Sequence, residues 1–169
     1  NKLNLILGLF AFSTYSFAQC GGAAGVTHPN GGGFVASTAT VESGAFIGVN
    51  HEVCHDSYVG EQVVINDGDK VKLQNNAYLN GEVTINPTVG NLILIRENSK
   101  IIGKATINIS NGANLYIQGK SIISGENVIL NANVASKNLI IKGNASVMES
   151  ATVEGEVTLD GNVKIGGTS

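Results

Sequence analysis

The sequence predicts an all-β fold, a single-stranded parallel β-helix of about seven coils. Two observations lead to this prediction. Aliphatic residues recur every six positions along most of the chain, and strand-forming and turn-forming residues dominate the composition. Val, Ile and Asn are abundant and Gly supplies 22 residues, whereas charged residues make up only 14%. Such a chain favours short strands separated by tight corners and offers little polar surface for helices.

The six-residue repeat begins at Val35 and continues in two phases. The first phase contains thirteen consecutive aliphatic positions: Val35, Val41, Ile47, Val53, Val59, Ile65, Val71, Ala77, Val83, Val89, Ile95, Ile101 and Ile107. The second phase contains Ile117, Ile123, Ile129, Ala135, Ile141, Val147, Val153, Leu159 and Ile165. The ten-residue step between the phases predicts a register slip near residues 108–116, in the form of an irregular coil or small loop.

A period of six fits neither an α-helix nor a strand with one buried face. It fits a solenoid in which each six-residue unit supplies one short strand, one inward aliphatic side chain and one corner. Gly and Asn recur between the aliphatic positions, where corners require backbone conformations with positive φ. We therefore assign residues 35–169 to the β-helix.

Residues 1–18 have the features of a Sec-type secretory signal peptide. Lys2 provides a positive start, a short apolar run follows, and Ser16 and Ala18 place small residues just before a cleavage site. The apolar run is too short to span a membrane, and no later stretch is long enough. The sequence therefore predicts export, to the periplasm, the cell surface or the extracellular medium.

Export changes how the two cysteines are interpreted. In an oxidising compartment, Cys20 and Cys54 are expected to form a disulfide that pins the Gly-rich N-terminal arm, residues 19–34, onto the β-helix. Two free thiols are one alternative. A lipoprotein acylated on Cys20 is another, although the residues before Cys20 depart from the lipobox pattern.

The charge distribution argues against nucleic-acid binding. The chain has a net charge of −3, and its sole arginine is Arg96. Binding to a phosphate backbone requires clustered cations, which this sequence lacks.

Two segments resemble the bacterial hexapeptide-repeat proteins. Ala39-Thr-Val-Glu-Ser-Gly-Ala-Phe-Ile-Gly-Val-Asn50 and the segment from Gly143 to Val157 follow the pattern of an aliphatic residue, a small or acidic residue and a later small residue. The resemblance implies a left-handed, triangular parallel β-helix that assembles as a homotrimer. Bulky residues near Ile93, Ile102 and Leu139 depart from the pattern, so a right-handed coil stays possible in the middle.

The same superfamily contains acyltransferases and γ-class carbonic anhydrases, so the histidines are the candidate catalytic or metal-binding residues. His51 and His55 are weak candidates, because they occupy different positions in their six-residue units and have one residue fewer between them than the zinc ligands of that family. No Arg lies nearby to complete such a site. We expect no cofactor, no metal and no catalytic residue.

The function predicted from the sequence is that of an exported structural or adhesive protein without catalysis, acting as a rigid surface spacer, adhesin or fibre segment. One alternative is a periplasmic hexapeptide-repeat enzyme, similar to the acyltransferases or to the γ-class carbonic anhydrases. A second is a carbohydrate-binding module, with Tyr58, Tyr78 and Tyr116 as weak candidates for stacking on sugars. Expected partners are further copies of the chain and a cell-surface molecule or polysaccharide.

Overall fold

The computed structural model describes residues 19–88, 92–110 and 112–166. The proposed signal peptide, residues 1–18, and the expected inward position Val89 lie outside the described residues. The described chain consists of short strands and one 3-10 turn, η1 (Gln19–Gly21). The strands form three sheets, numbered in the order in which the chain enters them.

Sheet 1 contains β1 (Gly25–Thr27), β2 (Phe34–Ala36), β5 (Glu52–Val53), β8 (Val71–Gln74), β11 (Ile93–Arg96), β14 (Asn114–Ile117), β17 (Asn138–Ile141) and β20 (Val157–Leu159). Sheet 2 contains β3 (Thr40–Val41), β6 (Tyr58–Val59), β9 (Tyr78–Asn80), β12 (Lys100–Ile102), β15 (Ile122–Ser124), β18 (Ser146–Met148) and β21 (Lys164–Ile165). Sheet 3 contains β4 (Phe46–Ile47), β7 (Val63–Ile65), β10 (Val83–Asn86), β13 (Ala105–Ile109), β16 (Val128–Ala132) and β19 (Thr152–Glu154).

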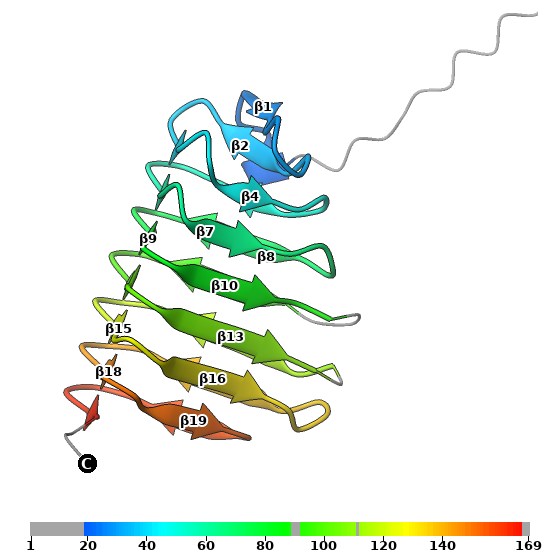
Figure 1. Ribbon diagram of the computed structural model, residues 1–169. Helices are drawn as coiled ribbons and strands as arrows, with labels where there is room; N and C mark the ends of the chain where they lie inside the picture. Colours follow the sequence, from blue (N-terminus) through cyan, green and yellow to red (C-terminus); the bar gives the residue numbers. More distant parts are fainter. Residues whose placement is uncertain (1–18, 89–91, 111, 167–169) are drawn as a thin grey trace, which may run out of the picture.

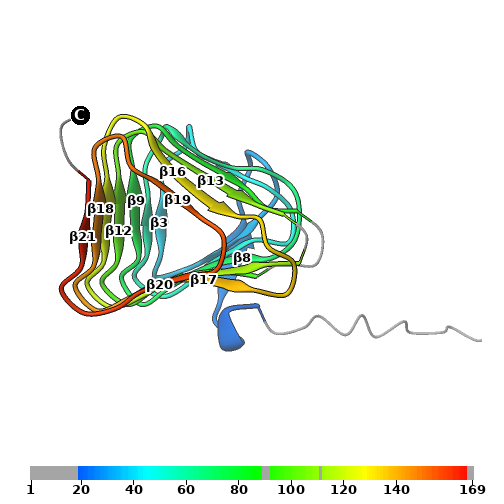
Figure 2. The same cartoon turned by 90° about the horizontal axis from the view of Figure 1, so that it is seen from below.

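The chain visits the three sheets in turn, and each strand pairs in parallel with the strand one coil away. Six coils are complete between β2 and β19, and β20 and β21 begin a further one. Figure 1 shows the coils stacked as a rod, and Figure 2 shows their three-sided outline. The all-β parallel β-helix is therefore confirmed, with about six coils rather than seven.

A continuous aliphatic core fills the interior of the rod. It extends from Val35 in the first coil to Leu159 in the last, and most of its side chains are completely buried. Each buried Leu, Ile or Val stabilises the fold by about 1.5–3 kcal/mol relative to its exposed state. Because each coil packs mainly against its neighbours, stability accumulates with coil number.

Coil length is not constant along the rod, yet a six-residue period finds most of the core. Asparagines that are hydrogen-bonded between neighbouring coils have sequence separations of 20, 22, 23, 24 and 18 at successive places along the chain. The longer coils contain strands such as β8 and β11, which bury two side chains each. When a coil is two residues longer, counting in steps of six reaches a residue two positions away on the same strand. That residue also points inward, because side chains along a strand alternate with period two.

An odd step makes the six-residue count fail on sheet 3. β13 and β16 are offset by an odd sequence separation of 23, so Ile107 pairs with Leu130, which points inward, while Ile129 points outward. Ala135 is exposed as well, so the predicted inward positions Ile129 and Ala135 are wrong.

The slip expected at residues 108–116 also takes a different form. β13 continues to Ile109 and β14 begins at Asn114, so both strands enter the predicted irregular segment. The additional residues are distributed over several coils, and each coil that lengthens keeps its parallel pairing.

The N-terminal arm forms ordered structure at the first coil. β1 pairs antiparallel with β2, in contrast to the parallel pairing elsewhere, and so covers the edge of sheet 1. η1 precedes β1 and places Cys20 in a buried position. β1 is then the last strand at this end of sheet 1, and a strand of three residues leaves only a short open edge, which limits pairing with other chains.

Candidate functional site

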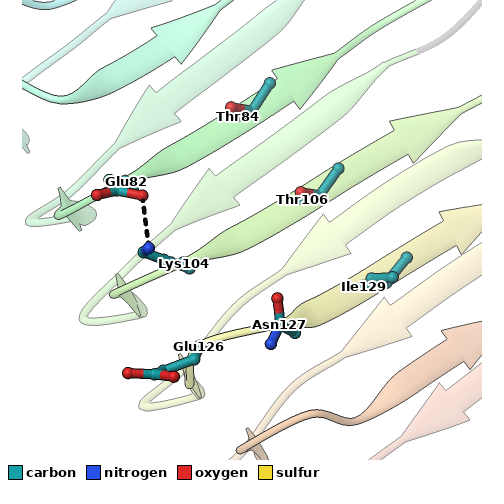
Figure 3. Close-up of a pocket in the computed structure, with 7 residues that line it drawn as sticks. All are labelled: Glu82, Thr84, Lys104, Thr106, Glu126, Asn127 and Ile129. Atoms are coloured by element: carbon teal, nitrogen blue, oxygen red, sulfur yellow. Dashed lines mark ion pairs between the residues drawn. The ribbon is translucent and has the colours of Figure 1, made fainter.

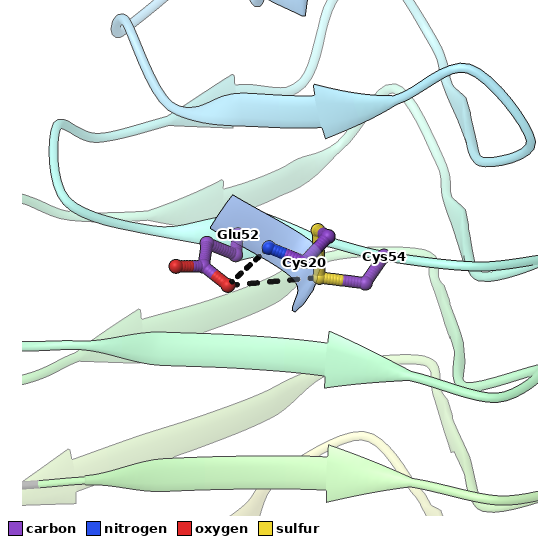
Figure 4. Close-up of side chains that lie close together, drawn as sticks. All are labelled: Cys20, Glu52 and Cys54. Atoms are coloured by element: carbon purple, nitrogen blue, oxygen red, sulfur yellow. Dashed lines mark hydrogen bonds between the residues drawn. A yellow bond between two sulfur atoms is a disulfide. The ribbon is translucent and has the colours of Figure 1, made fainter. Parts of the chain in front are cut away.

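The N-terminal arm is attached to the rod by the disulfide expected from the sequence. Cys20 and Cys54 are bonded, with their Cα atoms 5.3 Å apart, and both are buried. Glu52 lies beside the disulfide, and its Oε2 accepts a hydrogen bond of 3.0 Å from the backbone N–H of Cys20 (Figure 4). The same oxygen lies 3.7 Å from Cys54 Sγ, a sulfur that carries no proton in a disulfide.

Glu52 is a buried carboxylate with two cationic partners. Its side chain is 2% exposed and forms ion pairs with Lys70 and with Lys72, the latter at 3.0 Å. Burial alone raises the pKa of the Glu52 carboxyl, but Lys70, the Cys20 N–H and Lys72 together lower the pKa below its usual value. Glu52 is therefore a charged connection between the arm and sheet 1.

This cluster is structural in the oxidised protein. Cys20, Glu52 and Cys54 are the one group of three potential ligands in the described chain whose ligand atoms lie within 4.8 Å of one another. Metal binding by cysteine requires a thiolate, which neither sulfur offers while the disulfide is intact. The disulfide also occupies the sulfur of Cys20 that lipid attachment would need, which disfavours the lipoprotein alternative.

The two candidate histidines, His51 and His55, lie in different environments. His51 is 1% exposed, and its two ring nitrogens contact the backbone: Nε2 lies 2.7 Å from the Asn66 carbonyl oxygen and Nδ1 accepts a bond of 3.2 Å from the Val71 N–H. This pattern requires the neutral ring with its proton on Nε2. Burial lowers the pKa of His51, although the Asn66 carbonyl and Asp67 oppose the shift. His51 therefore has no free lone pair for a metal, and His55 lies at an exposed corner with φ 54°.

Two of the three candidate tyrosines lie together on the outer surface of sheet 2. The rings of Tyr58 and Tyr78 stack with their centroids 4.9 Å apart and an interplanar angle of 15°. Lys100 Nζ lies 5.9 Å from the centroid of the Tyr78 ring, so the stack continues as a cation–π contact. Tyr116 belongs to β14 on sheet 1, so it is not part of this group.

A polar hollow of about 350 Å³ lies beside Tyr58. Its lining includes Glu42, Glu61 and Asn80, and the Tyr58 hydroxyl donates to Glu42 Oε1 at 3.3 Å. Gly60 directly follows β6, and a Cβ there would collide with the Asn80 side chain of the next coil. Hydroxyl, amide and carboxylate groups around an aromatic ring are the groups with which proteins bind small polar ligands.

A second hollow lies on the outer surface of sheet 3, as Figure 3 shows. It has a volume of about 270 Å³, and Thr84, Thr106 and Ile129 form one side along successive coils. Glu82 pairs with Lys104 at 3.1 Å on the other side, and both side chains are 56% exposed. Both side chains of this ion pair are therefore open to contact with a ligand.

Comparisons with protein families, curated proteins and solved structures found no match to this chain. The class of protein is therefore defined by its own architecture, a parallel β-solenoid with a disulfide-bonded N-terminal arm. The fold is consistent with the hexapeptide-repeat resemblance of the sequence. Within the described residues, no helix has the length and apolar character to cross a membrane.

The sequence analysis did not identify Glu52 or Lys100 as candidate functional residues. Glu52 directly precedes Val53, a predicted inward residue, so alternation along the strand places Glu52 on the outer face. Nothing in the sequence indicates that its side chain is buried there. Lys100 contacts Tyr78 of the neighbouring coil, and which residues are neighbours across coils depends on coil length.

Proposed function

We propose that this chain is an exported structural or adhesive β-helix of the hexapeptide-repeat type, which acts without catalysis and recognises its partner on an outer face. The left-handed winding and homotrimeric assembly of that superfamily are part of the proposal. The disulfide supports export, because stable disulfides form in oxidising compartments.

The observation that carries the proposal is the filled interior. Aliphatic side chains occupy the core from the first coil to the last, and the hollows described on sheets 2 and 3 lie on outer faces. A ligand therefore meets the protein on a rigid and repetitive surface. Rigid placement of surface groups favours binding, because little conformational entropy is lost when the partner docks.

Fractionation of a bacterium that expresses the full chain tests export and surface placement. The expected result is a processed protein that begins at Gln19, recovered with the cell surface or the medium, whose removal reduces attachment to glycan-coated surfaces. Recovery of an unprocessed protein from the cytoplasm would refute the export proposal. Native mass spectrometry of the processed protein tests assembly and catalysis together: zinc-free trimers are expected, whereas one stoichiometric zinc per subunit would favour the enzyme alternative.

Carbohydrate binding is the second candidate function, and the Tyr58–Tyr78 stack beside a polar hollow favours it. Glycan-array binding should decrease in Tyr58→Ala, because the ring forms a wall of the hollow. Tyr116→Ala is the matched control, since it removes an equivalent side chain on a different sheet. Equal binding by both variants would exclude the stack as a sugar platform.

A further inference from the structure

A third hollow lies on the outer surface of sheet 2, one coil beyond the tyrosine stack. Its volume is about 360 Å³, and it is lined by Asn98, Lys100, Lys120 and Ile122. Lys100 and Ile122 are direct neighbours in the pairing of β12 with β15. Asn98 precedes β12 and Lys120 precedes β15, so both lie next to the N-terminal ends of these neighbouring strands. We call this the lysine hollow.

The polar groups of the lysine hollow act as hydrogen-bond donors. Lys ammonium groups donate and cannot accept. Asn98 Oδ1 accepts a bond of 3.3 Å from Asn76 Nδ2, which occupies one of its two lone pairs, and the Asn98 amide NH₂ group offers two donors to a ligand. A hollow with this chemistry selects a ligand that supplies several acceptors.

The two lysines differ from most lysines of the rod. Lys70 and Lys72 pair with Glu52, and Lys104, Lys137 and Lys142 each pair with a carboxylate at 3.0–3.1 Å. In the described part of the chain, neither Lys100 nor Lys120 has a carboxylate within ion-pair distance. Two like charges at one hollow repel each other, and an anion between them removes this repulsion.

The remaining surface of the lysine hollow is apolar. Ile122 is 38% exposed, and Ile102, also on sheet 2, is 36% exposed. Tyr78 lies on the other side of Lys100, so aromatic and aliphatic surface continues along the same row of the sheet. A ligand that fits has an anionic group attached to a body with an apolar face.

We propose that the lysine hollow binds an acidic glycan, with a sugar carboxylate or sulfate between Lys100 and Lys120 and the C–H face of the ring against Ile122. This inference rests on the proposed adhesive function and names its ligand class. An extended chain suits the site because the row continues to Tyr78 in the adjacent coil, about 4.8 Å away. A pyranose unit has a comparable length, so consecutive sugars contact consecutive coils.

Titration of the mature protein with hexagalacturonate by isothermal calorimetry tests this proposal. Cellohexaose provides the neutral arm, a heparin hexasaccharide the sulfate arm and inorganic phosphate the free-anion arm. The test variant is Lys100→Gln/Lys120→Gln. The matched control is Lys137→Gln/Lys142→Gln, which removes the same charge from two lysines that pair with carboxylates elsewhere on the rod. Ile122→Ser tests the apolar contact, and urea unfolding verifies that each variant is folded.

The expected result is binding of an acidic hexasaccharide that weakens at least about tenfold in the lysine-hollow variant, a loss of about 1.4 kcal/mol. The control should change little, Ile122→Ser should weaken binding, and added salt should weaken it further. Equal weakening in the test and control variants would show attraction by net charge and overturn the proposal. Inorganic phosphate that competes as well as the hexasaccharides would overturn the glycan as the ligand. Attachment of cells that survives in the lysine-hollow variant would overturn this site and leave the adhesive function standing.

Discussion

Removal of the Cys20–Cys54 disulfide should destabilise the first coils of the rod. The bond closes a chain segment with a sequence separation of 34 residues. On the chain-entropy model, a loop of this length contributes about 4 kcal/mol at 25 °C. We therefore expect the Cys20→Ala/Cys54→Ala variant to lose about 3–4 kcal/mol of unfolding free energy, much of the stability of a typical domain.

Urea unfolding monitored by circular dichroism measures this loss, and limited proteolysis locates it. Cleavage should appear first within residues 19–27, because η1 and β1 then depend on Glu52, the β1–β2 pairing and the hydrogen bond from Ser37 N–H to the Ala24 carbonyl. A matched control is the wild-type protein in a reducing buffer, which should behave as the variant does. A loss below about 1 kcal/mol with unchanged proteolysis would refute the reasoning and show that the arm is held by its hydrogen bonds.

Three further predictions concern a corner, a ladder and a buried charge. Gly119 (φ 76°) and Gly112 (φ 74°) have the same left-handed backbone conformation. A Cβ added at Gly119 would lie 2.7 Å from the Gly143 carbonyl oxygen. A Cβ added at Gly112 would have no neighbouring atom within 4 Å. Gly112→Ala should therefore cost about 1–2 kcal/mol in urea unfolding, and Gly119→Ala about 1–3 kcal/mol more; equal losses would contradict the overlap. Asn108 accepts from Asn86 at 2.8 Å and donates to Asn131 at 3.1 Å. Asn108→Ala should cost about 1–2 kcal/mol in the same assay, and no loss would show that water replaces the ladder. The folded-state pKa of Glu52 lies below the ordinary glutamate value of 4.5, so its contribution to stability is complete above pH 4.5 and is lost as the pH falls through the folded-state pKa. Glu52→Gln should reduce this acid sensitivity, and an unchanged pH profile of the unfolding free energy would exclude Glu52 as its source.

The sequence predicted the repetitive core because alternation along a strand tolerates even steps. Ile95 and Ile101 are buried as the six-residue count requires, although the coil they belong to is longer than three six-residue units. Ile129 fails because the step on sheet 3 is odd and reverses the face. Most of the residues that point inward were therefore predictable from the sequence, whereas the length of each coil was not.

The outer surface was much less predictable than the core. Tyr58 and Tyr78 stack because the register of β6 and β9 makes them direct partners, whereas three strict six-residue units would have placed Asn76 beside Tyr58. Lys104 pairs with Glu82 one coil earlier, while Lys100 faces Tyr78. Whether a lysine is paired depends on which side chain lies one coil away, so a small change in coil length gives every surface group different neighbours.

By itself, the sequence determined the fold class and the pairing of the cysteines, because both follow from residue types and their spacing along the chain. Aliphatic residues at regular intervals must be buried together, and Cys20 and Cys54 are the one pair that the given sequence offers for a disulfide. The tertiary structure alone decided the burial of Glu52, the hydrogen bonds of His51 and the grouping of Asn98, Lys100, Lys120 and Ile122 in one hollow. These features depend on contacts between coils, and such contacts are fixed by the register of parallel strands in coils of unequal length.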